Sequence, residues 1–109
     1  DVYKRRGGMS TGTYVLAGRQ GAMKETFGST CHGAGRQMSR KTAIENLNIE
    51  TVRKKMADQG IYLRAGSDEG VLEEAPDAYK DVSEIIEVVC NAGLTAKVAK
   101  LTPIGVVKG

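Results

Sequence analysis

The sequence predicts an α+β fold of mixed short strands and about four helices, on three observations. First, 109 residues suffice for one modest domain and not for two. Second, hydrophobic residues make up 40% of the chain and aromatic residues only 5%, without Trp, so the core must be aliphatic. Third, stretches rich in β-forming residues alternate with stretches of helical periodicity, and glycines stand at the breaks.

Local signals divide the first two thirds of the chain into elements. β-branched runs predict strands, helical spacing of apolar residues predicts helices, and Gly clusters mark connections. In order, the sequence predicts a basic, glycine-rich loop over the first dozen residues, a strand over 11–17, a short helix over 21–27, a glycine-rich loop over 28–36, helices over 36–47 and 50–59, a strand over 61–65 and a polar turn over 66–70.

The last third is organised around one amphipathic helix. Asp81 caps this helix, with Glu84 three residues later as an acidic variant of the capping box. Five apolar residues share one side of it: Val82, Ile85, Ile86, Val89 and Cys90. Before the helix, Pro76 must open a helical turn rather than interrupt one. After it, residues 95–107 alternate loosely around Pro103, which indicates an irregular strand near an edge.

Charge and hydropathy restrict the class of protein. The net charge is +3, and the basic residues cluster in 4–6, 36–41 and 97–108, apart from the acidic stretch 68–87. This separation suits a phosphate-bearing partner better than the total does. No stretch approaches the roughly 20 apolar residues of a membrane span, and the amino terminus lacks the apolar run of a secretory signal. We therefore expect a cytoplasmic protein without membrane contact.

The segment 28–40, GSTCHGAGRQMSR, contains the candidate chemistry. Gly33 and Gly35 let backbone amides approach a ligand, and a helix that starts at residue 36 would point its positive end at them. Arg36 and Arg40, four residues apart, would share one helical face and grip phosphate. The only histidine, His32, could then transfer a proton or attack phosphorus. A capping or surface histidine with solvent-facing arginines is the alternative. One His without a Cys or carboxylate cluster makes no metal site.

The same segment is very similar to the signature of the RNA-splicing ligase family known as RtcB. The flanking stretches resemble its carboxy-terminal region in order and spacing: TGTYVLAG, EEAPDAYKDVSEIIEVV and KVAKLTPIGVVKG. The resemblance implies that residues 8–109 are the guanylate-accepting, C-terminal part of a larger ligase fold. The stretch 4–10, KRRGGMS, departs from the family's usual pattern. Residues 1–7 are therefore expected to be an irregular start, with 1–6 as a remnant of cloning or splicing.

The resemblance also implies a reaction. The family joins RNA with a 2′,3′-cyclic phosphate or 3′-phosphate end to RNA with a 5′-hydroxyl, using GTP and Mn²⁺. His32 matches the histidine that becomes guanylylated. The residues matching the GMP site are Gly8, Met9, Thr13, His32, Gly33, Ala34, Gly35, Tyr79 and Lys108, with Arg36 and Arg40 expected at RNA phosphate.

The family's Mn²⁺ ligands lie upstream of the region that this chain resembles. The resemblance implies three partners: RNA, such as tRNA halves or broken RNA; the N-terminal part of the ligase; and archease as an activator. We expect the isolated chain neither to guanylylate itself nor to ligate RNA. The alternative functions are a non-catalytic module that binds guanine nucleotide or RNA, and a structural domain that is inert without its other half.

Overall fold

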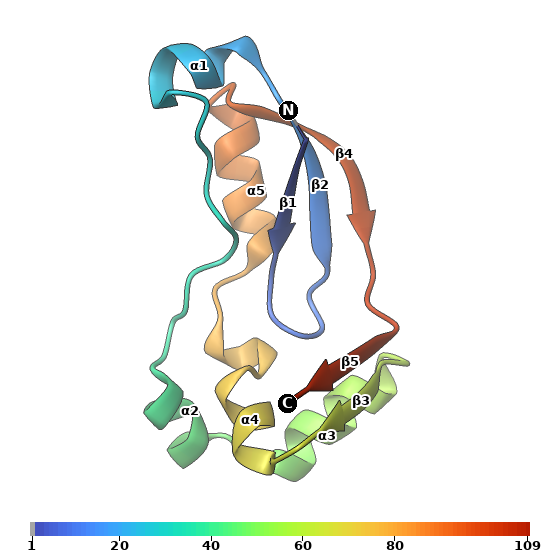
Figure 1. The fold of residues 1–109 in the computed structure, drawn as a ribbon. Helices are drawn as coiled ribbons and strands as arrows, with labels where there is room; N and C mark the ends of the chain where they lie inside the picture. Colours follow the sequence, from blue (N-terminus) through green and yellow to red (C-terminus); the bar gives the residue numbers. More distant parts are fainter. Residues whose placement is uncertain (1) are drawn as a thin grey trace.

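The chain, seen in a computed structural model that describes residues 2–109, has two small sheets and five α-helices (Figure 1). The elements are β1 (Val2–Arg6), β2 (Thr13–Gly18), α1 (Gln20–Thr26), α2 (Arg40–Asn46), α3 (Ile49–Asp58), β3 (Tyr62–Ala65), α4 (Asp68–Glu73), the 3-10 turn η1 (Pro76–Ala78), α5 (Val82–Asn91), β4 (Thr95–Leu101) and β5 (Gly105–Lys108). The α+β class is confirmed, with five α-helices in the described range where about four were predicted.

One end of the molecule is a three-stranded antiparallel sheet in the order β1-β2-β4, with α5 packed on one face. We call β1, β2, β4 and α5 the sheet region. Its core forms where Leu16 of β2 meets Val82 and Ile86 of α5, all three with no exposed surface. Asp81 caps α5 by accepting a hydrogen bond from the Ser83 amide at 2.8 Å, so the predicted cap is confirmed.

The other end of the molecule packs α2, α3 and α4 around the parallel pair of β3 and β5. We call these five elements the helical region. Its core contains Met56, Val71 and Ala75, and Met9 from the β1–β2 connection reaches into it. Two cores in a row explain the elongated shape of the chain, which extends 46 × 26 × 21 Å.

Backbone bonds between two loop segments join the regions. The extended segment 28–39 runs along the molecule beside the connection from α4 to α5 (Figure 1). Arg36 and Tyr79 form an antiparallel bridge, and the Lys80 amide donates to the Gly35 carbonyl at 2.8 Å. These bonds fix the glycine-rich segment against the turn that carries Tyr79.

Two predictions at the start of the chain and of α2 are wrong. Residues 2–6 form β1 rather than a loop, because every one of them pairs with β2 despite the polar side chains; Asp1 lies outside the described residues. The helix predicted over 36–47 begins only at Arg40, because Ser39 caps it by accepting from the Thr42 amide. Arg36 lies before that cap, so Arg36 and Arg40 do not share a helical face.

Two further elements differ from their predictions. The polar turn predicted over 66–70 contains the start of α4, because Ser67 accepts a hydrogen bond from the Gly70 amide and caps a helix there. The single irregular strand predicted over 95–107 is divided at Pro103 into β4 and β5, which join different sheets. Within residues 2–109, no helix has both the length and the apolar character needed to cross a membrane.

Candidate functional site

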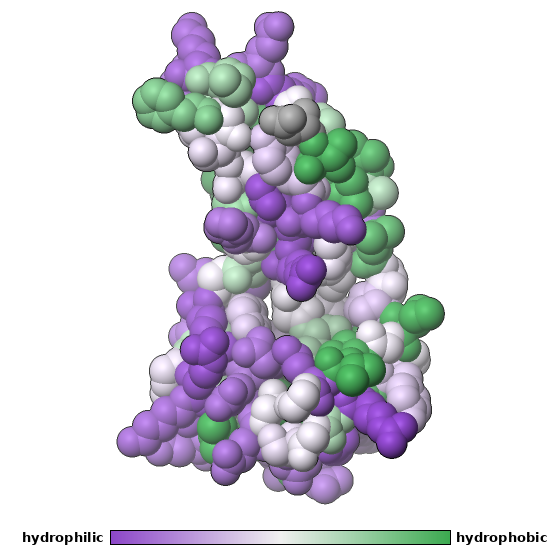
Figure 2. Space-filling view, in the orientation of Figure 1, coloured by the Kyte–Doolittle hydropathy of each residue, from purple (hydrophilic) through white to green (hydrophobic). Residues whose placement is uncertain are grey.

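A pocket of about 580 Å³ lies between the sheet region and the helical region, visible as the hollow at the centre of Figure 2. Its volume is in the range of sites for small molecules. Four segments that are distant in sequence line it: the β1–β2 hairpin with Arg6, Gly7, Gly8, Met9, Gly12 and Thr13; His32, Gly33 and Ala34; Glu74 and Tyr79; and Pro103, Gly105, Val106, Val107 and Lys108.

The reactive candidate, His32, stands on the sheet side of the pocket. Gly33 forms a parallel bridge with Arg6, and the Ala34 amide donates to the Arg6 carbonyl at 3.1 Å. A side chain at Gly33 would place its Cβ 2.4 Å from that carbonyl oxygen, so only glycine allows this approach. The neighbouring imidazole is exposed, and within residues 2–109 it makes no hydrogen bond or ion pair. The ring nitrogens are therefore not engaged by other groups of the described chain, at a residue that lines the pocket.

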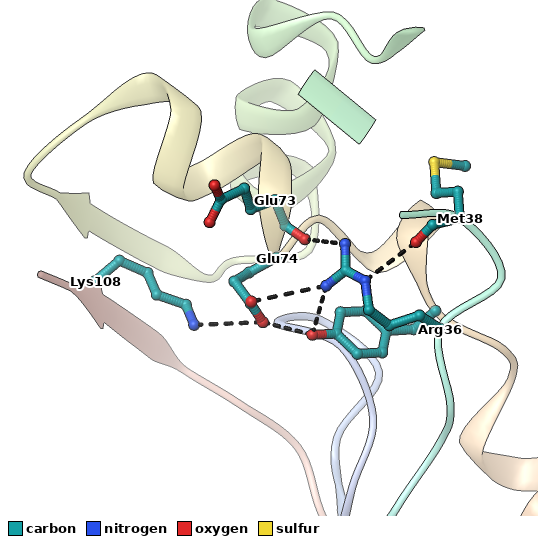
Figure 3. A network of polar contacts seen from close by, with 6 residues as sticks. Arg36, Met38, Glu73, Glu74 and Lys108 are labelled. Carbon is teal, nitrogen blue, oxygen red and sulfur yellow. Dashed lines mark hydrogen bonds and ion pairs between the residues drawn. The ribbon is translucent and has the colours of Figure 1, made fainter. Parts of the chain in front are cut away.

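The opposite wall is a connected polar network (Figure 3). The Tyr79 hydroxyl donates to Glu74 Oε2 at 2.5 Å. Lys108 Nζ lies 3.7 Å from the same oxygen, and Arg36 Nη1 lies 3.7 Å from Oε1. A carboxylate held by one phenol and two cations keeps a fixed position. Glu74 thus joins the carboxy-terminal Lys108 to Tyr79 across the pocket wall.

Arg36 contacts Tyr79 and Glu74 of this wall without lining the pocket itself. Its guanidinium donates to the Tyr79 hydroxyl at 3.0 Å, to the Glu73 carbonyl at 2.6 Å and to the Met38 carbonyl at 3.1 Å. The same group lies over the Tyr79 ring, 4.9 Å from its centroid. Arg36 does not line the pocket, so its donors hold the protein together rather than face a ligand.

The phenol of Tyr79 stays protonated to higher pH than a free tyrosine. Burial raises its pKa first, and the hydrogen bond and negative charge of Glu74 raise it further, whereas the charge of Arg36 opposes them. At neutral pH the hydroxyl is therefore a donor to Glu74.

The pocket brings together most of the residues that the sequence predicted for it. The predicted residues that line it are Gly8, Met9, Thr13, His32, Gly33, Ala34, Tyr79 and Lys108. Gly35, Arg36 and Arg40 do not line it. The Gly35 carbonyl is taken by the Lys80 amide, Arg36 faces Tyr79 and Glu74, and the exposed Arg40 starts α2. Their predicted ligand roles remain predictions.

Sequence reasoning missed two charged residues of the pocket. Arg6 was set apart with an irregular start, yet as the last residue of β1 it lies beside Gly33 and on the pocket wall. Glu74 stands in an acidic stretch that reads as solvated surface. Only the turn at Pro76, which brings Tyr79 back toward α4, could have indicated that Glu74 has partners.

The described residues do not fit a Mn²⁺ site. Between Val2 and Gly109 there is no group of three or more His, Cys, Asp or Glu side chains that could hold a metal ion. His32 is the only histidine of the chain, and the pocket carboxylate, Glu74, is already engaged with Tyr79.

Comparison of the sequence with known proteins shows which family this chain resembles. Residues 6–109 match the model of a family described as tRNA-splicing ligase RtcB. Relatives named tRNA-splicing ligase RtcB are 54% identical in Pyrococcus abyssi and 53% identical in Pyrococcus horikoshii, each over 103 residues and 94% of this chain. The matching family is thus one of tRNA-splicing ligases.

The chain belongs to the RtcB family. It spans only 11% of the length of the P. abyssi relative and 12% of the P. horikoshii relative. A relative in Thermococcus kodakarensis is 50% identical, and 21% of its length is covered. Most of each relative therefore has no counterpart in this chain.

Proposed function

We propose that this chain provides the guanylate-accepting histidine and the GMP pocket of a GTP-dependent RNA ligase, as the C-terminal part (residues 8–109) of its active fold. The observation that supports the proposal is the pocket itself. It collects His32, Tyr79 and Lys108 from segments far apart in the sequence, with the imidazole exposed. A histidine that served only as a buried structural residue would need no such opening.

The proposed reaction is the one that the RtcB resemblance implies, with His32 as the nucleophile. A ring nitrogen of His32 attacks the α-phosphorus of GTP, the P–O bond to pyrophosphate breaks, and a phosphoramidate forms. An oxygen of the RNA 3′-phosphate then displaces the imidazole and takes the GMP. The 5′-hydroxyl of the second RNA attacks the activated 3′-phosphate, and GMP leaves. Each step exchanges one bond to phosphorus for another.

The pocket residues divide between phosphate and base in this proposal. Arg6 is the cation on the His32 side, so it takes a phosphate-binding role that the sequence gave to Arg36. Lys108 and Tyr79, fixed by Glu74, receive the guanine base. Arg40, exposed at the start of α2, is free to meet RNA phosphate. RNA with 3′-phosphate and 5′-hydroxyl ends, Mn²⁺ held by other parts of the ligase, activation by archease and a cytoplasmic address belong to the same proposal.

A chimaera tests this function. In it, the matching segment of the P. abyssi relative is replaced by this chain. Incubation with GTP radiolabelled at the α-phosphate and Mn²⁺ is expected to label the protein, with the label on His32. The isolated 109-residue chain, treated in the same way, is expected to stay unlabelled. A label on the isolated chain, or a labelled chimaera whose adduct maps elsewhere, contradicts the proposal.

A second candidate, a guanine-nucleotide-binding module without catalysis, is favoured by one observation. The wall of Glu74, Tyr79 and Lys108 is formed by this chain alone. Calorimetric titration of the isolated chain with GMP separates the two candidates when it is combined with the chimaera. Binding by the chain together with an unlabelled chimaera supports the module, whereas a labelled chimaera supports the ligase.

A further inference from the structure

The parallel pair of β3 and β5 packs one face against the helical region and exposes the other. Leu63, Ala65 and Val106 contact the buried core of that region. Side chains alternate along a strand, and paired residues share a face. We call the opposite side the β3–β5 outer face; its residues are Tyr62, Arg64, Gly105 and Val107.

Two side chains of the β3–β5 outer face have no partner within residues 2–109. Tyr62 is 68% exposed, and its hydroxyl makes no hydrogen bond there. Arg64 is exposed, and it forms no ion pair or side-chain hydrogen bond in the same range. Because the two residues are two apart on one strand, they project from the same side. The ring and the guanidinium are therefore both available to a ligand.

The residue paired with Tyr62 is a glycine. Tyr62 lies opposite Gly105, and the Tyr62 amide donates to the Ile104 carbonyl at 2.9 Å. Glycine in a strand can mark a place where another molecule approaches the backbone closely. A Cβ at Gly105 would lie 3.9 Å from the Tyr62 Cβ. Its absence leaves the space beside the tyrosine ring open to a planar group.

The β3–β5 outer face adjoins the pocket. Gly105 and Val107 belong to this face and also line the pocket. Figure 2 shows hydrophobic atoms over β5 and its connection to β4, at the edge of the central hollow. In the proposed reaction the RNA 3′-phosphate enters the pocket to take GMP from His32. The nucleotides before that phosphate must cross the rim of the pocket, and this face is part of the rim.

We propose that the β3–β5 outer face binds the single-stranded end of the RNA that carries the 3′-phosphate. This inference rests on the proposed function. A base stacks on the Tyr62 ring, and Arg64 pairs with a phosphate of the same strand. Aliphatic side chains alone would suit any apolar partner. An aromatic ring and an unpaired guanidinium beside a nucleotide-sized pocket are the combination that binds unpaired nucleotides.

The charge of the β3–β5 outer face favours RNA over a second copy of this chain. Its four residues include one cation and no carboxylate, so nothing on the face repels phosphate. A two-fold contact between two copies would enclose two Arg64 guanidiniums in one interface without an acidic partner from this face. RNA brings the negative charge that Arg64 lacks.

The absence of tryptophan from the sequence allows a site-specific test in the isolated chain. Tyr62→Trp places a single fluorescent indole on the β3–β5 outer face. Phe27→Trp is the matched control, because Phe27 is also an exposed aromatic residue, 92% exposed at the end of α1. Single-stranded oligoadenylate with a 3′-phosphate is expected to quench the Tyr62→Trp emission saturably and to leave Phe27→Trp unchanged. Duplex RNA of the same length is expected to quench neither, because its bases are paired.

RNA affinity, measured by anisotropy of the labelled oligoadenylate, separates the ring from the cation. Tyr62→Ala is expected to weaken binding about fivefold or more, whereas Tyr62→Phe keeps the ring and stays within about twofold. Arg64→Ala is expected to weaken binding about fivefold and to lower the slope of log affinity against log salt by about one. Arg19→Ala, at another exposed arginine without an ion pair in the described chain, is the control and is expected to stay within about twofold.

Several results overturn the proposal. They are no RNA binding by the unsubstituted chain, equal quenching of the Tyr62→Trp and Phe27→Trp probes, and equal quenching by duplex and single strand. A shift of the Tyr62→Trp emission with protein concentration alone assigns the face to a second copy. In the chimaera, Tyr62→Trp emission that is already that of a buried indole before RNA is added assigns the face to another part of the ligase.

The titrations use neither GTP nor Mn²⁺, so the RNA-binding face and the proposed reaction fail separately. Selective quenching of Tyr62→Trp together with an unlabelled chimaera keeps the RNA-binding face and rejects the ligase chemistry. A chimaera labelled on His32 whose Tyr62→Trp emission does not respond to RNA does the reverse.

Discussion

The two regions that flank the pocket differ in how completely the described residues cover their apolar surfaces. The helical region encloses its core with α3, α4, β3 and β5, and its pocket wall is held by Glu74, Tyr79 and Lys108. The sheet region is covered by α5 on one face only, and its pocket wall presents a free imidazole. The wall of Glu74, Tyr79 and Lys108 is thus organised by contacts within the chain, whereas the side with His32 adjoins a sheet that has one face uncovered within residues 2–109.

The largest effect is expected from substitution of His32, which lines the pocket opposite the wall of Glu74, Tyr79 and Lys108. In the chimaera, His32→Ala is expected to reduce the GMP adduct to background, because no other imidazole in this chain can form it. GMP affinity, measured by calorimetry, is expected to change by less than about threefold, because the residues proposed to receive the base lie on the other wall. Autoradiography of the labelled protein gives the first quantity. Complete loss of GMP binding would show that the two walls do not act separately.

The next largest effect is a loss in the free energy of unfolding, expected from a substitution in the core of each region. Leu16→Ala in the sheet region and Met56→Ala in the helical region remove side chains that are 0% and 1% exposed. Each is expected to lower the free energy of unfolding by about 2–5 kcal/mol. Urea unfolding followed by circular dichroism measures both. The control, Val2→Ala at an exposed position of β1, is expected to cost less than about 0.5 kcal/mol in the isolated chain. A cost below about 1 kcal/mol for Leu16→Ala would mean that α5 does not hold the sheet as described.

The sequence predicted helices and strands where local signals were sufficient. Asp81 marks the start of α5 because a carboxylate at that position accepts a backbone amide, a purely local effect. The strand β1 was missed because its evidence is not local. Three of its five residues are Lys or Arg, and only pairing with β2 makes the segment extended.

The same distinction between local and long-range signals explains which site residues the sequence placed correctly. Residues found through family similarity, such as Thr13 and Lys108, meet in one pocket. Arg36 was predicted to face phosphate on the assumption that its helix began there. The cap at Ser39 moves the helix start, and the guanidinium then turns to Tyr79 and Glu74. A long-range ion pair of this kind leaves no signal in the spacing of residues.

A smaller effect is expected at Glu74, on the pocket wall that it forms with Tyr79 and Lys108. Glu74→Gln keeps the shape of the side chain but removes the charge that lies 3.7 Å from both Lys108 and Arg36. The lysine then loses its fixed position, and GMP affinity is expected to fall about fivefold to tenfold. The matched control is Glu73→Gln, because the Glu73 side chain has no ion pair in the described chain and only its carbonyl binds Arg36. A rise in GMP affinity, as removal of negative charge alone would give, would contradict the positioning role.

The smallest expected effect is a pH dependence of stability. It arises from Tyr79, on the pocket wall that also contains Glu74 and Lys108. Burial and Glu74 raise the pKa of Tyr79 above its ordinary value, so the folded chain keeps the phenolic proton longer than the unfolded chain. The stability from this group is therefore complete below about pH 10 and is lost as the pH rises through the folded pKa.

Tyr79→Phe removes the titrating group together with its hydrogen bonds. The variant is expected to be less stable than the unsubstituted chain by about 1 kcal/mol near neutral pH. This gap is expected to narrow above about pH 10, because only the unsubstituted chain loses the contribution of the phenol. Urea midpoints across the pH range measure it. Tyr62→Phe, at a residue that is 68% exposed, is the control, and its curve is expected to run parallel to that of the unsubstituted chain. A difference in stability that stays constant at high pH would show that the phenol is not held by Glu74. The wall of Glu74, Tyr79 and Lys108 would then not be fixed by the contacts described here.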